Sequence, residues 1–327
     1  MSKLGNIAVV SSGTDNSGIN GAIRAVVRTA ASKGVKVFGV RWGYRGFIDN
    51  QMSILTSRDV SGKIGKAGCF LGTAKPHKVL TDESIQVAIK NCKKQNITGI
   101  IVIGGLGSLQ TSRKFIEQGM NVIGIPSTIQ DDIAGTDISL GVDSAVNNIV
   151  KCIDKIRGSS SSRDRTFLVE VEGRECGSLA IRSALVSGAD FCLIPERPAK
   201  DMTKLTRRMA EFSLKGKNQC LTILSTGWKP GIDELTQFLQ EHQHETDLYV
   251  RNTVLGYVQR GGAPTGYDRI LGTHMGSRAV TELIEGKSGR MVALKGNKIE
   301  SVPYEEALDQ KKVIDPALFT LFKTTRV

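Results

Sequence analysis

Three acidic residues and two threonines lie in the stretch from Ile123 to Gly141, IGIPSTIQDDIAGTDISLG. Carboxylates can take up and release protons, and hydroxyl side chains can orient a substrate, so these residue types suit acid–base catalysis. The stretch begins with a short apolar run and passes through a polar loop into a helical pattern. α/β enzymes carry their reactive side chains in loops that follow strands. We therefore predict that the reaction centre lies in this loop.

Two further loops are rich in glycine and stand between an apolar run and a helical pattern: SGTDNSGIN at 12–20 and GGLGS at 104–108. A strand, a glycine-rich turn and a helix together aim backbone N–H groups at a phosphate. The spacing of the first loop matches neither GxGxxG nor a P-loop with its lysine. For that loop, a tight connection and a phosphate cradle therefore both remain open.

The elements that position these loops are predicted from hydrophobic periodicity. Continuous apolar runs predict buried strands at 6–11, 35–40, 98–103, 121–125, 166–171, 191–194 and 220–224. Helical spacing predicts helices at 84–94, 109–117, 139–156, 176–186, 203–214, 234–241 and 271–284, and one after the first loop that carries Ile19, Ile23, Val26 and Val27. Alternating strands and helices of this kind predict the α/β class with doubly wound parallel sheets. The pattern restarts at Thr166, which predicts two halves with a cleft between them as the default site.

Composition narrows the class of protein. The chain has 327 residues, enough for one large or two packed α/β domains, and no apolar run approaches the ~20 residues of a membrane span. The N-terminus reads as a first strand and not as a signal peptide. Six cysteines without CxxC pairs and only four histidines argue against a zinc site and a disulfide framework. We expect a cytoplasmic protein that has no membrane partner.

The net charge of +12 suits anionic partners. A single-stranded nucleic-acid groove combines a basic track with stacking aromatic residues, but here the basic residues are dispersed and aromatic residues make up only 5%. A role with DNA or RNA would rest on the pI near 9.5 alone. Phosphorylated small molecules are the preferred partners.

Five motifs stand in collinear order along nearly the whole chain: SSGTDNSGIN, GGLGS, PSTIQDDIAGTD, EGREC at 172–176 and VLGYVQRGGAPTGYDR at 254–269. With these motifs the chain resembles the ATP-dependent phosphofructokinase family of the bacterial type. The resemblance implies two doubly wound, Rossmann-like three-layer domains with a cleft where nucleotide phosphates meet fructose 6-phosphate. The larger, nucleotide-side domain would comprise residues 1–140 and 254–305, and the smaller, sugar-phosphate-side domain residues 141–253 and 306–327.

The sequence departs from the family pattern at the expected reaction centre. The family motif is Thr-Ile-Asp-Asn-Asp, whose first Asp is the general base, and this chain has TIQDD at 128–132. Gln130 stands at the position of the base, and an amide cannot take up a proton near neutral pH. The resemblance implies that the other residues of the catalytic set are Thr128, Asp132, Arg174 and Lys75.

Three more departures concern the nucleotide side. Leu106 stands where the family has an aspartate for magnesium, and magnesium requires oxygen ligands. Thr14 stands where the family has a second glycine, and Lys75 replaces the transition-state arginine, which keeps the charge but loses the bidentate fork. The nucleotide-binding positions implied by the resemblance are Gly13, Thr14, Tyr44, Gly105, Leu106, Gly107 and Ser108, with no residue left to hold a metal.

The sugar-phosphate side is partly retained. Arg165, Arg251 and Arg260 match the family's phosphate-binding arginines, and guanidinium groups suit phosphates well. Thr226 replaces a glutamate that contacts the sugar, Glu172 replaces a methionine, and Tyr257 replaces a histidine.

A separate effector site is also implied by the resemblance. Bacterial members bind a nucleotide or phosphoenolpyruvate between subunits. The matching residues here are Arg24, Arg28, Arg157, Lys215 and Lys217, with Asp190 where an acid helps to hold the Mg²⁺ that accompanies a nucleotide. Arg24 and Arg28 are four residues apart, so one helix face presents both.

Two hypotheses follow. In the preferred one, the chain is a catalytically impaired or inactive phosphofructokinase-like subunit that binds phosphorylated ligands and has a regulatory or scaffolding role in glycolysis. It would form a homotetramer or assemble with an active paralogue. In the alternative, it is an active 6-phosphofructokinase that uses ATP or another donor with an altered base, Asp131 or Asp132, and an altered metal site.

Overall fold

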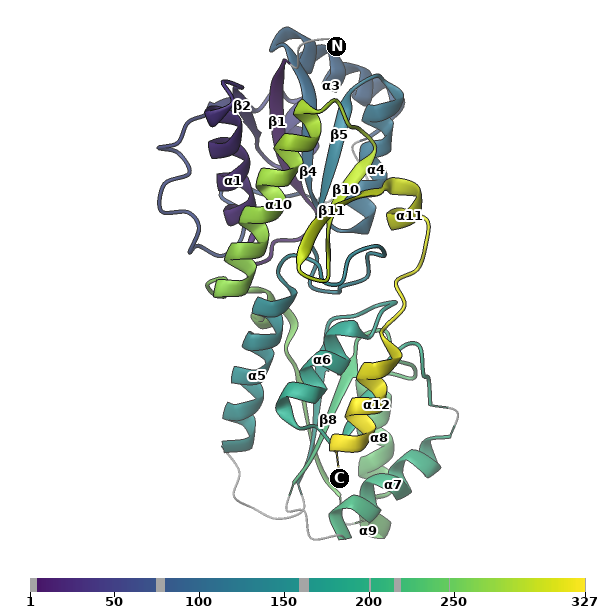
Figure 1. Ribbon diagram of the computed structural model, residues 1–327. Helices are drawn as coiled ribbons and strands as arrows, with labels where there is room; N and C mark the ends of the chain where they lie inside the picture. Colours follow the sequence, from purple (N-terminus) through teal and green to yellow (C-terminus); the bar gives the residue numbers. More distant parts are fainter. Residues whose placement is uncertain are drawn as a thin grey trace. The chain divides into compact units, whose positions relative to one another are not determined.

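The computed structural model describes residues 5–74, 80–158, 165–199, 201–214, 219–246 and 248–326. The chain folds as two compact units, each with its own sheet (Figure 1). Unit 1 comprises residues 1–129, 133–144 and 260–312, and unit 2 comprises residues 130–132, 145–259 and 313–327. None of the helices in the described ranges is both long and apolar enough to cross a membrane.

The described sheet of unit 1 has seven strands in the order β11-β10-β5-β4-β1-β2-β3. Its strands are β1 (Asn6–Ser12), β2 (Val37–Val40), β3 (Met52–Leu55), β4 (Ile97–Gly104), β5 (Asn121–Pro126), β10 (Arg290–Lys295) and β11 (Lys298–Pro303). The strands from β10 to β2 run parallel, whereas β3 and β11 pair antiparallel at the two edges. Ser12, Gly104 and Pro126 end three neighbouring strands in register, so their following loops leave the same edge of the sheet.

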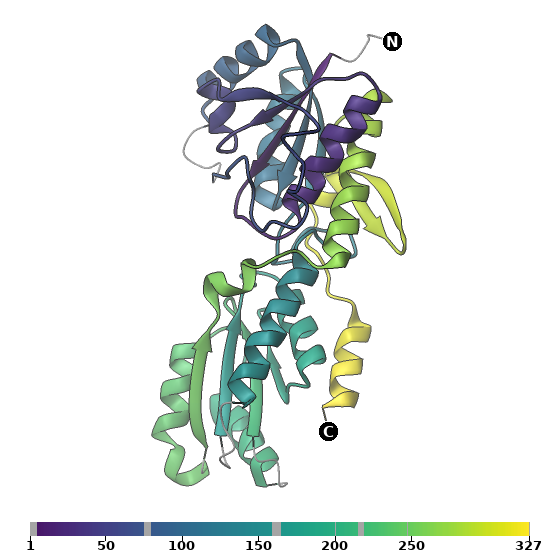
Figure 2. The ribbon, with the colours of Figure 1, turned by 90° about the vertical axis from the view of Figure 1, so that its left-hand side faces the viewer.

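Both faces of this sheet are covered by helices, as Figure 2 shows. The helices of unit 1 are α1 (Ile19–Ser32), α2 (Arg45–Ile48), α3 (Asp82–Lys94), α4 (Leu106–Glu117), α10 (Gly266–Ile284) and α11 (Tyr304–Leu308). Side chains alternate between the faces: Ile7 and Val9 of β1 belong to a core with α1 and α10, and Ala8 and Val10 to a core with α3 and α4. A Cβ at Gly276 would come within 2.4 Å of the Ala22 carbonyl oxygen, so glycine permits the close packing of α10 on α1.

Unit 2 contains a parallel sheet of four strands in the order β7-β8-β6-β9. Its strands are β6 (Arg165–Val171), β7 (Phe191–Leu193), β8 (Gln219–Ser225) and β9 (Tyr249–Val254). Its helices are α6 (Ser178–Ser187), α7 (Met202–Leu214), α8 (Ile232–Glu241), α9 (Gln243–Thr246) and α12 (Pro316–Thr325), and α5 (Val142–Gly158) leads into it from unit 1. A 3₁₀-helix, η1 (Gly256–Arg260), follows β9. Trp228 and Leu235 are among the fully buried side chains of its core.

Three differences from the sequence prediction have physical reasons. Residues 254–259 belong to unit 2, because the Leu255 N–H continues β9 by donating to the Glu170 carbonyl oxygen at 3.2 Å. Residues 306–312 belong to unit 1, because Ala307 and Leu308 are buried in its core. The larger sheet is mixed at both edges and not wholly parallel. The predicted α/β class with two sheets covered by helices is confirmed.

Candidate functional site

The loop after β1 adopts a conformation that requires glycine. Gly13 has φ of +104°, and its N–H donates to the Ala74 carbonyl oxygen at 3.1 Å. A Cβ at Gly13 would lie 3.2 Å from Ser108 Oγ, so this loop runs beside the first turn of α4. The Thr14 side chain is exposed. Within unit 1 it therefore crowds no neighbour, and any cost it carries would fall on a bound ligand.

Helix α4 begins at Leu106, three residues before the predicted start at Leu109. Gly105 precedes it in an extended conformation and provides no side-chain cap, so the N–H groups of Leu106 and Gly107 are available to an anion, whereas the Ser108 N–H donates to the Gly105 carbonyl oxygen at 3.0 Å. Gly107 is exposed, and a Cβ placed on it would meet nothing within 4 Å. The second glycine-rich loop thus has the geometry of a phosphate site.

Leu106 opens that helix with a side chain that cannot ligate a metal. It is half-buried and packs against the core cluster that contains Phe115. Magnesium requires oxygen ligands, so this position does not fit the ion that accompanies ATP in the family. In addition, no group of three or more His, Cys, Asp or Glu side chains is placed to hold a metal ion anywhere in the described ranges.

Tyr44 supports the α4 loop from the core. The ring is 1% exposed and stacks on Phe115 with centroids 5.6 Å apart, and its hydroxyl donates to the Ser108 carbonyl oxygen at 2.6 Å. Burial raises the pKa of Tyr44 well above its ordinary value. Direct nucleotide binding by Tyr44 stays a prediction, and the buried ring weighs against it. The observed contact makes Tyr44 a positioning residue for the loop.

At the expected position of the base, Gln130 is half-buried and its Oε1 accepts the backbone N–H of Arg174 at 3.3 Å. The amide oxygen is thus oriented by the EGREC loop, whose Arg174 side chain is exposed. Thr128, in unit 1, is 9% exposed and lies beside Gly105. Asp132 is half-buried.

Asp131 is held inside unit 2 and not presented to a substrate. It has φ of +52° and is 0% exposed. Its Oδ2 accepts the hydroxyl of Ser178 at 2.7 Å and lies 3.6 Å from the Nε of Arg182. These contacts attach the TIQDD loop to the first turn of α6 and weigh against Asp131 as the altered base of the alternative hypothesis.

Replacement of Asp131 therefore distinguishes a structural role of this residue from a catalytic one. We expect Asp131→Ala to lower the free energy of unfolding by about 2–3 kcal/mol, because a buried hydroxyl loses its acceptor and alanine disfavours a positive φ. Asp131→Asn, which tolerates this φ and keeps an acceptor, should cost about 1 kcal/mol or less. Denaturant unfolding measures both. Normal stability of Asp131→Asn together with complete loss of an existing turnover would instead assign Asp131 as the base.

The sugar-phosphate residues fall in both units. In unit 2, the exposed Arg251 donates to the Val250 carbonyl oxygen at 3.0 Å. The backbone of Arg165 lies two register positions away on the neighbouring strand β6. Arg260 is in unit 1, where burial lowers its pKa. Glu172 is half-buried, Thr226 is exposed and Tyr257 is 84% exposed.

The residues predicted for the effector site are also divided between the two units. Arg24 is half-buried and Arg28 exposed on α1. In unit 2, Arg157 donates to the Ser187 carbonyl oxygen at 2.8 Å. Asp190 is 3% exposed, and its Oδ2 accepts the Leu221 N–H at 2.8 Å, which weighs against its predicted role at magnesium. Lys75, Lys215 and Lys217 lie outside the described residues.

The sequence prediction missed Asn16, which connects two of the loops. It is 2% exposed, and its Nδ2 donates to Ser127 Oγ at 2.9 Å. The bond joins the loop after β1 to the loop after β5, 111 residues further along the chain. No local pattern marks such a pair, because each partner looks like an ordinary polar loop residue.

Comparison with known proteins agrees with this arrangement. A family model described as Phosphofructokinase matches residues 6–283. The chain is 38% identical over 317 residues to an ATP-dependent 6-phosphofructokinase of Oceanobacillus iheyensis, covering 97% of this chain and 98% of the relative. It is 39% identical over 315 residues to one of Clostridium botulinum strain Hall, covering 96% and 97%.

Solved structures give the same result. Phosphofructokinase from Pichia pastoris in the T-state superposes with a TM-score of 0.85 at 30% identity, over 94% of this chain and 38% of that longer chain. A pyrophosphate-dependent phosphofructokinase from Marinobacter aquaeolei has a TM-score of 0.82 at 19% identity, over 95% and 86%, and supports the fold alone. The sequence match, the fold and the collinear loops together show that this chain belongs to the phosphofructokinase family.

Proposed function

We propose that this chain is a catalytically impaired phosphofructokinase-family protein that binds phosphorylated metabolites and acts as a regulatory or scaffolding subunit in glycolysis. The observation that carries the proposal is the state of the base position. Gln130 supplies an amide whose oxygen accepts the Arg174 N–H, and the neighbouring Asp131 is buried against Ser178.

The chemistry follows from the side chains. Phosphoryl transfer to a sugar requires removal of a proton from the attacking hydroxyl, and an amide cannot receive it near neutral pH. Loss of a general base costs about 10²–10⁴ in rate, or roughly 3–5 kcal/mol of activation free energy. Leu106 removes in addition the oxygen ligand for magnesium at the start of α4.

Binding is supported by features that remain. The uncapped first turn of α4 suits a phosphate, and the exposed Arg251 and half-buried Arg260 supply guanidinium groups. Arg24 and Arg28 add a second basic surface on α1. We propose sugar phosphates, nucleotides or phosphoenolpyruvate as ligands. Mg²⁺ would accompany a bound nucleotide. The cytoplasm is the proposed setting, and a homotetramer or an assembly with an active paralogue the proposed form.

A second candidate is an active 6-phosphofructokinase. It is favoured by the identity of 38–39%, over nearly the whole chain, to proteins named ATP-dependent 6-phosphofructokinase. Asp132 would then be the remaining carboxylate of the TIQDD loop that could act as base, since Asp131 is 0% exposed.

Parallel measurement of binding and turnover distinguishes the two. We expect calorimetry to detect fructose 6-phosphate binding that Arg251→Gln weakens at least tenfold, because a charge-assisted contact is lost. We expect a coupled assay with ATP or pyrophosphate to give a turnover number at least ~100-fold below the ~10 s⁻¹ of a median enzyme.

The exposed Arg207 of α7 offers a control, since Arg207→Gln changes the net charge equally without touching the motifs. Turnover near that of a median enzyme, abolished by Asp132→Asn, would establish the active-enzyme alternative. Absence of binding by every phosphorylated ligand would refute the regulatory proposal.

A further inference from the structure

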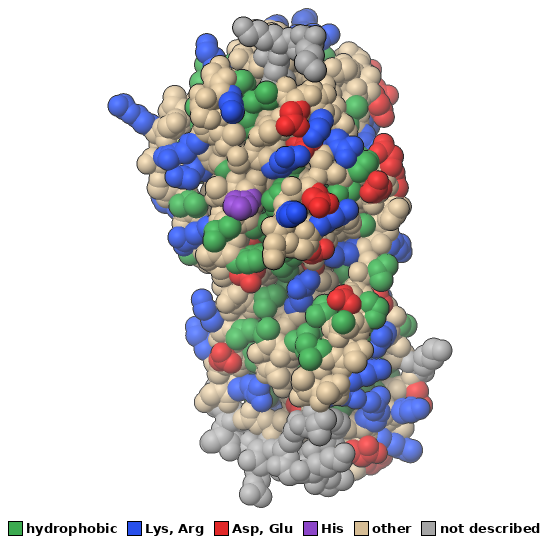
Figure 3. Space-filling view, in the orientation of Figure 1, with side chains coloured by type: hydrophobic (Ala, Val, Ile, Leu, Met, Phe, Trp, Pro, Cys, Tyr) green, Lys and Arg blue, Asp and Glu red, His purple; other side chains and the backbone are tan. Residues whose placement is uncertain are grey.

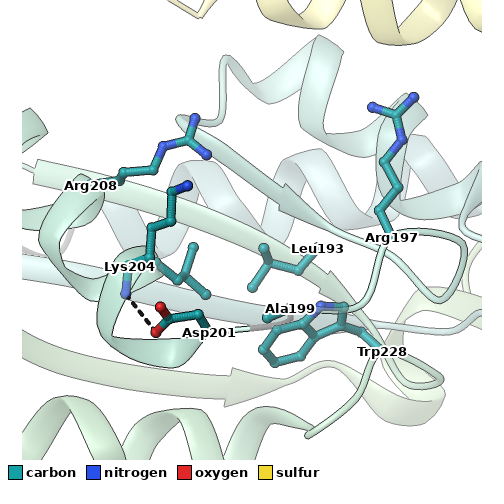
Figure 4. A pocket seen from close by; sticks show the side chains of 8 residues that line it. Leu193, Arg197, Ala199, Asp201, Lys204, Arg208 and Trp228 are labelled. Carbon is teal, nitrogen blue, oxygen red and sulfur yellow. Dashed lines mark hydrogen bonds between the residues drawn. The ribbon is translucent and has the colours of Figure 1, made fainter.

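A pocket in unit 2 is lined by none of the loop residues described above. Its volume is about 210 Å³. It is formed by the end of β7, the segment that leads into α7, the first turns of α7 and the residue at 228. The lining residues are Leu193, Arg197, Ala199, Asp201, Lys204, Leu205, Arg208 and Trp228, most of which are labelled in Figure 4.

Three of the lining side chains are cations. Figure 4 shows the charged ends of Lys204 and Arg208 on one side of the pocket and Arg197 on the other, with apolar side chains between them. Lysine and arginine side chains also gather on the face of unit 2 where Figure 1 draws α12 and α7, as Figure 3 shows. Lys204 and Arg208 are four residues apart on α7, where like charges repel each other across one turn of the helix.

These charges are not neutralised by the parts of the chain that are described. Among those residues, no salt bridge involves Arg197, Lys204 or Arg208. The one lining acid, Asp201, accepts the Lys204 backbone N–H at 3.0 Å through Oδ1, so it caps the helix. Burial, and then the charge of Arg208, lower the pKa of nearby Arg326, whereas the charge of Asp190 raises it.

One of the cations is held in place by the fold. The guanidinium carbon of Arg197 lies 3.9 Å from the ring centroid of Phe319 on α12. A cation–π contact at this distance restricts the side chain, so less conformational entropy is lost when an anion binds to it.

The base of the pocket carries a second indication of a ligand. Trp228 is 0% exposed, and no acceptor for its Nε1–H is found among the described residues. An unsatisfied buried donor is unfavourable, and an acceptor oxygen of a ligand could satisfy it. Leu193 and Leu205, each 9% exposed, make the surrounding surface apolar.

We propose that this pocket binds a small organic phosphate. Lys204 and Arg208 contact the phosphate, Arg197 contacts an anionic oxygen at the opposite end of the molecule, the leucines contact the short carbon skeleton between them, and the indole of Trp228 donates to a further oxygen. The volume of about 210 Å³ is below the ~300–1,000 Å³ typical of ligand pockets, so a compact phosphate fits and a nucleotide does not. The pocket shares no residue with the arginines on α1 or with Arg251.

Tryptophan fluorescence tests the proposal directly. The chain has two tryptophans, so a Trp42→Phe background leaves Trp228 as the only tryptophan, which can be excited selectively over the tyrosines. We expect phosphoenolpyruvate to change this emission with saturation, and inorganic phosphate to compete with it. Lys204→Gln and Arg208→Gln should each raise the dissociation constant about tenfold or more, because each removes a charge-assisted contact.

Arg207→Gln is the matched control, because Arg207 is exposed on the same helix but does not line the pocket. It should leave the dissociation constant within about twofold, because its exposed charge is screened by solvent and salt and makes no contact with the ligand. Trp228→Phe, followed by calorimetry, removes the indole donor and should weaken binding. Circular dichroism of every variant checks that it is folded.

Three results would overturn the proposal: no saturable change of Trp228 emission at millimolar phosphoenolpyruvate, equal weakening by Arg207→Gln, or weakening by Arg24→Gln but not by Lys204→Gln. The last would place the binding at the arginines of α1. Fructose 6-phosphate binding measured on the same variants reports on the proposed function separately, since no pocket residue is assigned to that ligand.

Discussion

A variant that combines Gln130→Asp, Leu106→Asp, Thr14→Gly and Lys75→Arg should phosphorylate fructose 6-phosphate with ATP about 10²–10⁴-fold faster than the unchanged chain. The combination supplies a proton acceptor, a magnesium ligand, space for the phosphates and a bidentate cation. Each of the four single variants should change turnover little, because residues that act as one unit are strongly non-additive. A coupled assay at saturating ATP and Mg²⁺ measures the effect.

The surroundings of Gln130 and Leu106 can accept these replacements. An aspartate at 130 could accept the same Arg174 N–H that Gln130 Oε1 accepts at 3.3 Å. An aspartate at 106 would lie in the first turn of α4, where the helix dipole favours a negative charge by about 0.3–1 kcal/mol. It would lose the packing of Leu106 against the neighbouring core, so a small loss of stability is expected.

Denaturant unfolding of the fourfold variant provides the control, since a folded but inactive variant would show that the deficit lies elsewhere. A Gln130→Asp single variant that already reaches full activity would contradict the claim that the four positions act together. Rapid turnover by the unchanged chain would contradict the premise that this chain is catalytically impaired.

The interior strands of unit 1 were predictable because both of their faces are buried. β1 and β4 read as continuous apolar runs, and the predicted ranges lie within one residue of the observed ends. The edge strands were not predictable in this way. β3 exposes Ser53 and Ile54, and most residues of β11 are exposed or only partly buried, so neither edge strand has a long apolar run. Their pairing depends on neighbours that are distant in the sequence.

The candidate site shows the same division between local and tertiary information. The glycines of GGLGS and the acids of TIQDD mark their loops locally, and both loops follow strands as predicted. The role of Asp131 depends on Ser178, 47 residues away, and that of Tyr44 on Ser108, 64 residues away. A sequence pattern contains neither contact, so side-chain types predicted the location of the loops but not which side chains face inward.

Replacement of Asp268 by alanine should lower the free energy of unfolding by about 3–5 kcal/mol, a large effect for a single change in unit 1. Asp268 is 0% exposed, and its carboxylate accepts the Gly141 N–H at 2.8 Å, the Ser144 N–H at 2.8 Å and the Ser144 hydroxyl at 2.6 Å. Alanine would leave these three donors buried without an acceptor. The exposed Asp154 of α5 is the control, and Asp154→Ala should change stability by about 0.5 kcal/mol or less.

The stability that the Asp268 carboxyl group contributes depends on pH, and the direction of this dependence follows from the shift of its pKa. Burial raises the pKa of Asp268 above its ordinary value of 3.8, although the bonds from Ser144 and Gly141 lower it in part. The folded state therefore binds the proton more tightly than the unfolded state, and the stability that Asp268 contributes falls as the pH rises from 3.8 through the raised pKa. The difference in unfolding free energy between the unchanged chain and Asp268→Asn, followed by urea unfolding, should decrease over that range. A difference that increases with pH would mean that the three hydrogen bonds outweigh the cost of burying the charge.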